Sequence, residues 1–92
     1  MARRPIENEL IETLRENELD FIPRGIFHIQ EIYDFIKNEF PHLCDDNYLC
    51  NQHCKSVDTQ PEWKHTVRTL LETLKKTDKI LKLPEIGFWE LR

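Results

Sequence analysis

The last third of the chain most constrains its fold, because the spacing of apolar residues there changes from that of a helix to that of a strand. Apolar residues recur every three or four positions, which predicts an amphipathic helix over 61–76. Apolar and polar residues then alternate over 79–83, turn-forming residues follow at 84–87, and apolar residues return at 88–91. The apolar stripe of the helix consists of Trp63, Val67, Leu70, Leu71 and Leu74. The sequence therefore predicts a long helix followed directly by a short β-hairpin.

The opposite face of the predicted helix is polar and basic, and only Glu72 opposes its positive charge. Its residues are Lys64, His65, Arg68, Thr69 and Lys76. The chain has a net charge of −4, but residues 61–82 contain six Lys or Arg and three Asp or Glu, a balance of +3. Residues 1–60 contain six Lys or Arg and twelve Asp or Glu, a balance of −6. This distribution favours a surface that contacts phosphates, and the alternative is an ordinary solvated helix face.

The residues before this helix predict two more helices and one more strand. Helical spacing covers 5–17, where Ile6, Leu10, Ile11 and Leu14 form the apolar stripe and Glu7, Glu9, Glu12 and Glu16 an acidic opposite face. The β-prone residues 26–28 form a candidate third strand. A second helix over 29–40 buries Ile29, Ile32, Tyr33, Ile36 and Phe40. We therefore expect one α+β domain over residues 1–92, mostly α: a winged helix-turn-helix of three helices and a small antiparallel sheet.

The connector over 41–59 is too long for a compact helix-turn-helix, which needs only about three or four residues between its second and third helices. The sequence therefore predicts an insertion here, with room for a helical turn of its own. It contains all three cysteines and two of the four histidines. Zn²⁺ prefers such ligands, and the candidate set is Cys44, Cys50, His53 and Cys54. Because this set lacks closely spaced Cys-x2-Cys pairs, buried reduced thiols are the favoured interpretation.

The basic face of the third helix is the strongest functional signal in the sequence. A helix fits the major groove, where Arg reaches guanine and flanking lysines reach phosphates. The candidates for base edges and nearby phosphates are Gln60, Lys64, His65, Arg68 and Thr69, and those for phosphates are Lys75, Lys76, Lys79 and Lys82. We expect the two tryptophans, Trp63 and Trp89, to pack in the core, and His28 to cap the second helix or act structurally.

The sequence offers no catalytic set. Asp45 and Asp46 followed by Glu62 and Lys64 have the residue types of a metal-dependent nuclease core, but the Glu-x-Lys pair falls in the first turn of a helix instead of on a strand. No apolar run approaches the about 18–20 residues of a membrane span, and no signal peptide follows Met1. An odd number of cysteines, three, fits reduced thiols. We therefore expect a cytoplasmic protein with no membrane contact.

Three segments together resemble the winged-helix domains attached to bacterial restriction endonucleases. They are Leu43-Cys44-Asp45-Asp46, the helix from Pro61 through Leu74-Lys75-Lys76, and Gly87-x-Trp89-Glu90-Leu91, within residues 27–91. The resemblance implies double-stranded DNA binding through Lys64, His65 and Arg68, with a nuclease module elsewhere in the parent protein. Some members of that group act on methylated DNA. The alternatives are a winged-helix transcription regulator and a winged helix that binds protein and not DNA.

Overall fold

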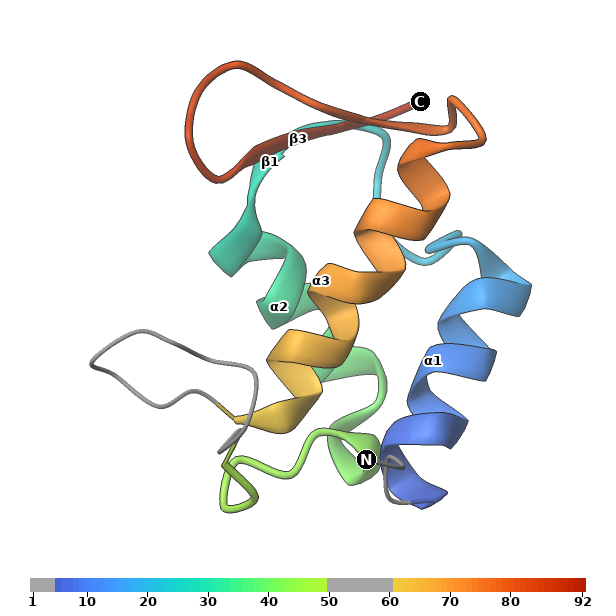
Figure 1. Ribbon diagram of the computed structural model, residues 1–92, viewed down its shortest axis with the longest axis vertical. Helices are drawn as coiled ribbons and strands as arrows, with labels where there is room; N and C mark the ends of the chain where they lie inside the picture. The colour runs from blue at the N-terminus through green and yellow to red at the C-terminus, as the bar shows by residue number, and fades with distance from the viewer. Residues whose placement is uncertain (1–4, 50–60) are drawn as a thin grey trace.

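The computed structural model describes residues 5–49 and 61–92 (Figure 1). In chain order its elements are α1 (Pro5–Asn17), β1 (Gly25–His28), α2 (Ile29–Glu39), the 3-10 helix η1 (Pro41–Leu43), α3 (Glu62–Lys75), β2 (Ile80–Lys82) and β3 (Phe88–Leu91). The described part is α+β and mostly helical, as the sequence predicted. The three helices and the three strands all lie within a residue or two of their predicted positions.

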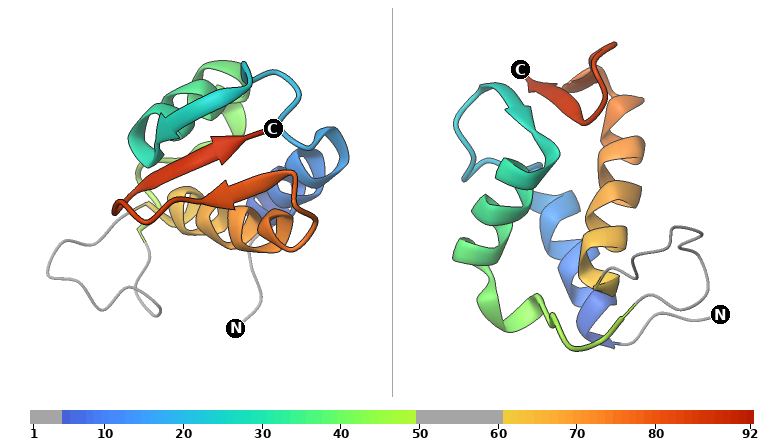
Figure 2. Two further views of the ribbon diagram at one scale, coloured as in Figure 1. Left: turned by 90° about the horizontal axis from the view of Figure 1, so that it is seen from above. Right: turned by 90° about the vertical axis from the view of Figure 1, so that its left-hand side faces the viewer.

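The strands form one antiparallel sheet in the order β1-β3-β2. The central strand β3 therefore pairs with β1, which lies before α2, and with β2, which lies directly after α3: Trp89 is opposite Phe27 on one side and Lys82 on the other. Figure 2 shows the three strands side by side over the helices. The sheet ties the loop before α2 to the hairpin after α3.

The core lies between the three helices and the inner face of the sheet. It contains the whole predicted stripe of α3, three of the four stripe residues of α1, and Ile80, Trp89 and Leu91 from the sheet. Trp63 is 2% and Trp89 4% exposed, which confirms that both tryptophans are core residues. Each large apolar side chain buried in this way contributes about 1.5–3 kcal/mol. In the described residues, no helix is both long enough and apolar enough to cross a membrane.

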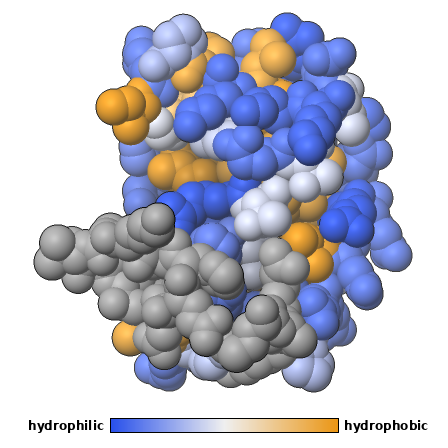
Figure 3. All heavy atoms as spheres, in the orientation of Figure 1, coloured by the Kyte–Doolittle hydropathy of each residue, from blue (hydrophilic) through white to orange (hydrophobic). Residues whose placement is uncertain are grey.

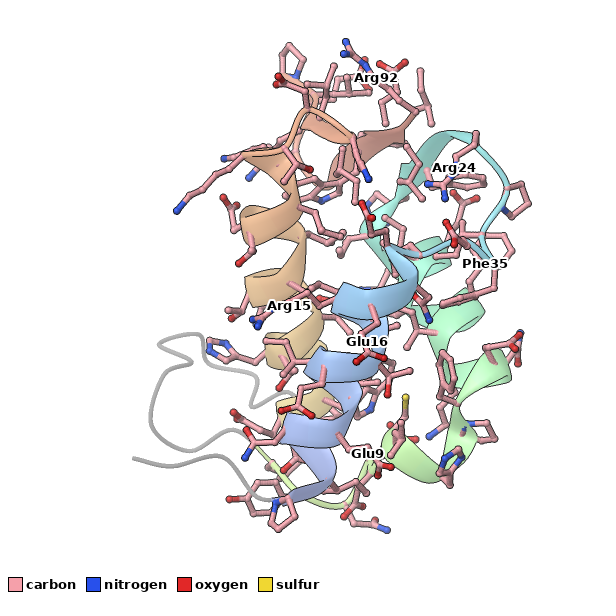
Figure 4. All side chains as sticks on the ribbon, turned by 90° about the vertical axis from the view of Figure 1, so that its right-hand side faces the viewer. Glu9, Arg15, Glu16, Arg24, Phe35 and Arg92 are labelled. Carbon is pink, nitrogen blue, oxygen red and sulfur yellow. The ribbon has the colours of Figure 1, made fainter. Side chains whose placement is uncertain are left out.

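One expectation about α1 is wrong, because Glu7 lies in the core and not on the acidic outer face. Its side chain is fully buried at 0% exposure. Glu7 stands three, four and seven residues before Leu10, Ile11 and Leu14, so it continues their stripe along the helix. The remaining acidic residues of α1 are exposed, and Figure 4 shows Glu9 and Glu16 on its outer side.

Helix α3 begins one residue later than its sequence suggested. Pro61 precedes the helix with an extended backbone (φ −55°, ψ 141°) and forms an isolated β-bridge with Leu49. The Glu62 N–H donates to the Tyr48 carbonyl at 2.9 Å, so the chain on either side of 50–60 comes together just before α3. This pairing holds Pro61 out of the helix. The connector contains a short helical turn, η1, as the sequence allowed. That the connector is an insertion stays a prediction.

His28 caps α2, as expected. Its Nδ1 accepts the Gln30 N–H at 3.2 Å, and Glu31 accepts the His28 N–H at 2.9 Å, which makes a reciprocal capping box. The next amide, that of Ile29, donates to the Gly87 carbonyl at 2.7 Å. The start of α2 and the β2–β3 turn are therefore held together at one place.

Candidate nucleic-acid interface

The polar face of α3 is the side directed away from the core, toward the viewer in Figure 1. In the same orientation, Figure 3 shows a mostly hydrophilic surface over the end of this helix. Lys64, His65, Arg68 and Thr69 are half-buried, and Lys76 is exposed. The helical spacing thus brings these five predicted residues to one side of α3, as the sequence implied. Gln60, the remaining candidate for base edges, lies outside the described residues.

Lys64 is the first basic residue of this face, and its side chain lies along aromatic rings. Its Nζ is 5.3 Å from the ring centre of Tyr33 and 5.7 Å from that of Trp63. The two rings pack edge-to-face with their centres 5.6 Å apart. An ammonium group over an aromatic face is attracted by the negative charge of that face. The position of Lys64 is therefore set by α2 as well as by its own helix.

The lysines proposed for phosphate contact differ in what surrounds them. Lys75 pairs with Glu72 at 2.8 Å, and Lys79 pairs with Glu18. The Lys82 Nζ lies 5.6 Å from the centre of the Trp89 ring. Ion pairs at the surface are weak, so phosphates can compete for these lysines, but each carboxylate lowers the local positive potential. Lys76, the residue directly after the end of α3, is exposed.

Glu72 is an acidic residue on the polar face of α3. The hydrogen bond from Lys75 is the main reason why the pKa of the Glu72 carboxyl is lowered from its ordinary value. The group is therefore ionised at neutral pH. It places a negative charge one helical turn from both Arg68 and Lys76.

The middle of the face contains His65, Arg68 and Thr69. The Thr69 hydroxyl donates to the His65 carbonyl at 3.1 Å, so its hydrogen is used inside the helix and its oxygen remains an acceptor. His65 and Arg68 each have an interaction of their own within the protein. A contact of either side chain with DNA would therefore compete with an existing one.

Sequence reasoning missed a polar cluster at the start of α3, centred on Asp46. Asp46 accepts the Trp63 indole N–H at 2.8 Å through Oδ1 and the Lys37 ammonium at 2.6 Å through Oδ2. Lys37 also donates to the Cys44 carbonyl at 2.9 Å. The hydrogen bonds from Lys37 and then Trp63 are the largest causes that lower the pKa of Asp46. The neighbouring Asp45 has a local turn role instead, since its Oδ1 accepts the Asn47 N–H at 2.9 Å.

The structure describes one member of the candidate zinc set. Cys44 is 3% exposed and has a free thiol, and burial raises its pKa to about 11. These are the properties of a buried apolar thiol, the interpretation that the spacing favoured. Cys50, His53 and Cys54 lie outside the described residues. Within 5–49 and 61–92, no three His, Cys, Asp or Glu side chains lie close enough together to bind a metal ion.

A scan against protein-family models and searches of curated proteins and of solved structures found no match to this chain. The functional argument therefore rests on the residues and their arrangement.

Proposed function

We propose that this chain is a winged-helix domain that binds double-stranded DNA. The observation that carries the proposal is the order of its elements. Three helices are combined with a sheet of order β1-β3-β2, and the β2–β3 hairpin follows directly after the helix with the basic face. In this arrangement α3 enters the major groove, and the hairpin forms the wing beside it.

The charges of α3 support the same proposal. Arg68 is the candidate for guanine, because a guanidinium can bind the two acceptors of that base, and the exposed Lys76 is the candidate for an adjacent phosphate. Lys64, Lys75, Lys79 and Lys82 add positive charge around them, although each also contacts another side chain. We therefore expect modest affinity that falls steeply with salt concentration.

We further propose that the domain is the recognition module of a restriction endonuclease and that it reads modified DNA. The support is the resemblance of three segments, 43–46, 61–76 and 87–91, to domains of such enzymes. The nuclease module would then lie elsewhere in the parent protein.

The test is a fluorescence-anisotropy titration with matched methylated and unmethylated duplexes at two salt concentrations. We expect binding that weakens as salt rises and a preference for the methylated duplex. Arg68→Ala should weaken binding by about 1–3 kcal/mol, with circular dichroism as the check that the variant folds. Lys76→Ala is the companion variant for the proposed phosphate contact, because shortening this exposed side chain leaves the core intact. Equal binding to both duplexes would remove the modified base from the proposal.

A second function, binding to another protein, is favoured by two ion pairs. Glu72 and Glu18 partly neutralise Lys75 and Lys79, and the outer side of α1 is acidic. In that case the anisotropy titration would show no duplex binding at either salt concentration. Salt-dependent binding of the duplex would dismiss this alternative.

A further inference from the structure

The β2–β3 turn presents an apolar side chain almost entirely to water. Ile86 is 94% exposed, more than the other exposed large apolar residues, of which Ile26 on β1 is next at 60%. Figure 3 shows an apolar protrusion at the upper left, where Figure 1 places this turn. Exposure of a single isoleucine is common, so its meaning depends on how the turn around it is built.

The turn is held rigidly from two sides. The Phe88 N–H donates to the Glu85 carbonyl at 3.3 Å and closes the turn with Ile86 at its apex. Gly87 has a φ of +82°, which favours glycine, and a Cβ at this position would lie 2.8 Å from Nε2 of His28. The Gly87 carbonyl accepts the Ile29 N–H at 2.7 Å. The turn is therefore fixed to the start of α2 with Ile86 pointing outward.

We propose that Ile86 is an apolar wedge that enters a groove of duplex DNA, partly separates two stacked base pairs and bends the duplex. This inference rests on the proposed function and adds the mode of DNA binding to it. Apolar side chains on proteins that bend DNA unstack base steps in this way and kink the duplex by about 20–90°. A rigid turn suits this role, because little conformational freedom is lost when it inserts.

The shape of the protrusion favours DNA over a protein partner. A stable protein interface buries about 800 Å² on each side, around a central cluster of apolar residues. Here one apolar side chain stands at the apex of a narrow turn, beside the exposed Pro84 and Glu85. A single protruding side chain is sufficient to separate two base pairs.

Energy transfer between fluorophores at the two ends of a duplex of about 30 base pairs tests the inference, because bending brings the ends together. The measurement is made at saturating protein and low salt for the whole chain, for Ile86→Ala and for Ile26→Ala. Ile26→Ala is a matched control, since it shortens another exposed isoleucine of the same sheet. We expect the wild type and Ile26→Ala to raise the energy transfer equally. Ile86→Ala should bind severalfold more weakly and leave the transfer near that of the unbound duplex.

Three outcomes would overturn the inference. A saturated wild-type complex with a straight duplex would remove bending while leaving DNA binding intact. Equal bending by Ile86→Ala would show that another part of the protein bends the DNA, and Ile86 would then be a candidate contact for a protein. No anisotropy change with wild-type protein would overturn both the inference and the proposed function.

Discussion

The indole N–H of Trp63 donates a hydrogen bond of 2.8 Å to the carboxylate of Asp46, 17 residues earlier in the chain. Trp63 is the first core residue of α3, and Asp46 is mostly exposed in the connector. The same carboxylate binds Lys37 of α2. One acidic side chain therefore connects α2, the connector and the beginning of α3, next to the position of Lys64.

Replacing Asp46 should loosen the beginning of α3. We expect Asp46→Ala to lower the free energy of unfolding by about 1 kcal/mol, because the indole N–H and the Lys37 ammonium lose a common acceptor that is itself partly solvated. Asp46→Asn should cost less, since its amide oxygen still accepts from Trp63. Urea unfolding followed by tryptophan fluorescence measures both. An equal loss of unfolding free energy in the two variants would show that Asp46 stabilises the fold through its charge and not through the hydrogen bond from the indole.

The same carboxylate should make stability depend on pH. Its pKa is lowered in the folded protein, chiefly by the hydrogen bonds from Lys37 and Trp63. A lowered pKa stabilises the fold at pH values above the ordinary pKa of 3.8, and this contribution is lost as the pH falls through the folded-state pKa. The difference in unfolding free energy between wild type and Asp46→Asn should therefore be constant near neutral pH and shrink below pH 3.8.

That comparison isolates Asp46, because Glu72 also has a lowered pKa and is present in both proteins. Urea titrations at several acidic pH values supply the free energies. A difference that stays constant down to the lowest pH at which both proteins fold would contradict the prediction.

Gly87→Ala should destabilise the protein by about 1–3 kcal/mol, since alanine is strained at a positive φ and crowds a neighbouring ring. The φ is +82°, and the added Cβ would lie 2.8 Å from His28 Nε2. The same substitution in a His28→Ser background separates the two causes, because serine also caps a helix but has no ring. Thermal unfolding should show a smaller cost in that background. An unchanged cost would assign the whole effect to the backbone.

Glu72→Gln should tighten DNA binding if α3 is the contact surface. The change removes the negative charge from the polar face and releases Lys75 from its ion pair of 2.8 Å. One additional phosphate contact makes the slope of log affinity against log salt steeper by about 0.9. Glu12→Gln, an equal change of charge on the exposed side of α1, is the control and should leave the slope unchanged. A similar gain in both variants would indicate a general effect of net charge.

The sequence by itself determined the elements and most of the core. Helical spacing located α1, α2 and α3, and the glycine and proline of 84–87 located the hairpin turn, because these patterns depend on residues close together in the chain. The burial of Trp63 and Trp89 followed from the same spacing. The basic face of α3 could be predicted as a set of residues for the same reason.

Only the tertiary structure decided which polar side chains meet. The contacts of Asp46 with Trp63 and of Lys79 with Glu18 join segments far apart in sequence, where no periodicity relates one residue to the other. Glu7 is buried, because its spacing from Leu10 and Leu14 puts it on the apolar stripe, whereas its charge alone suggested the outer face. Charge counted along the sequence described the basic segment, but the number of lysines left to meet a phosphate depends on neighbours that folding brings together.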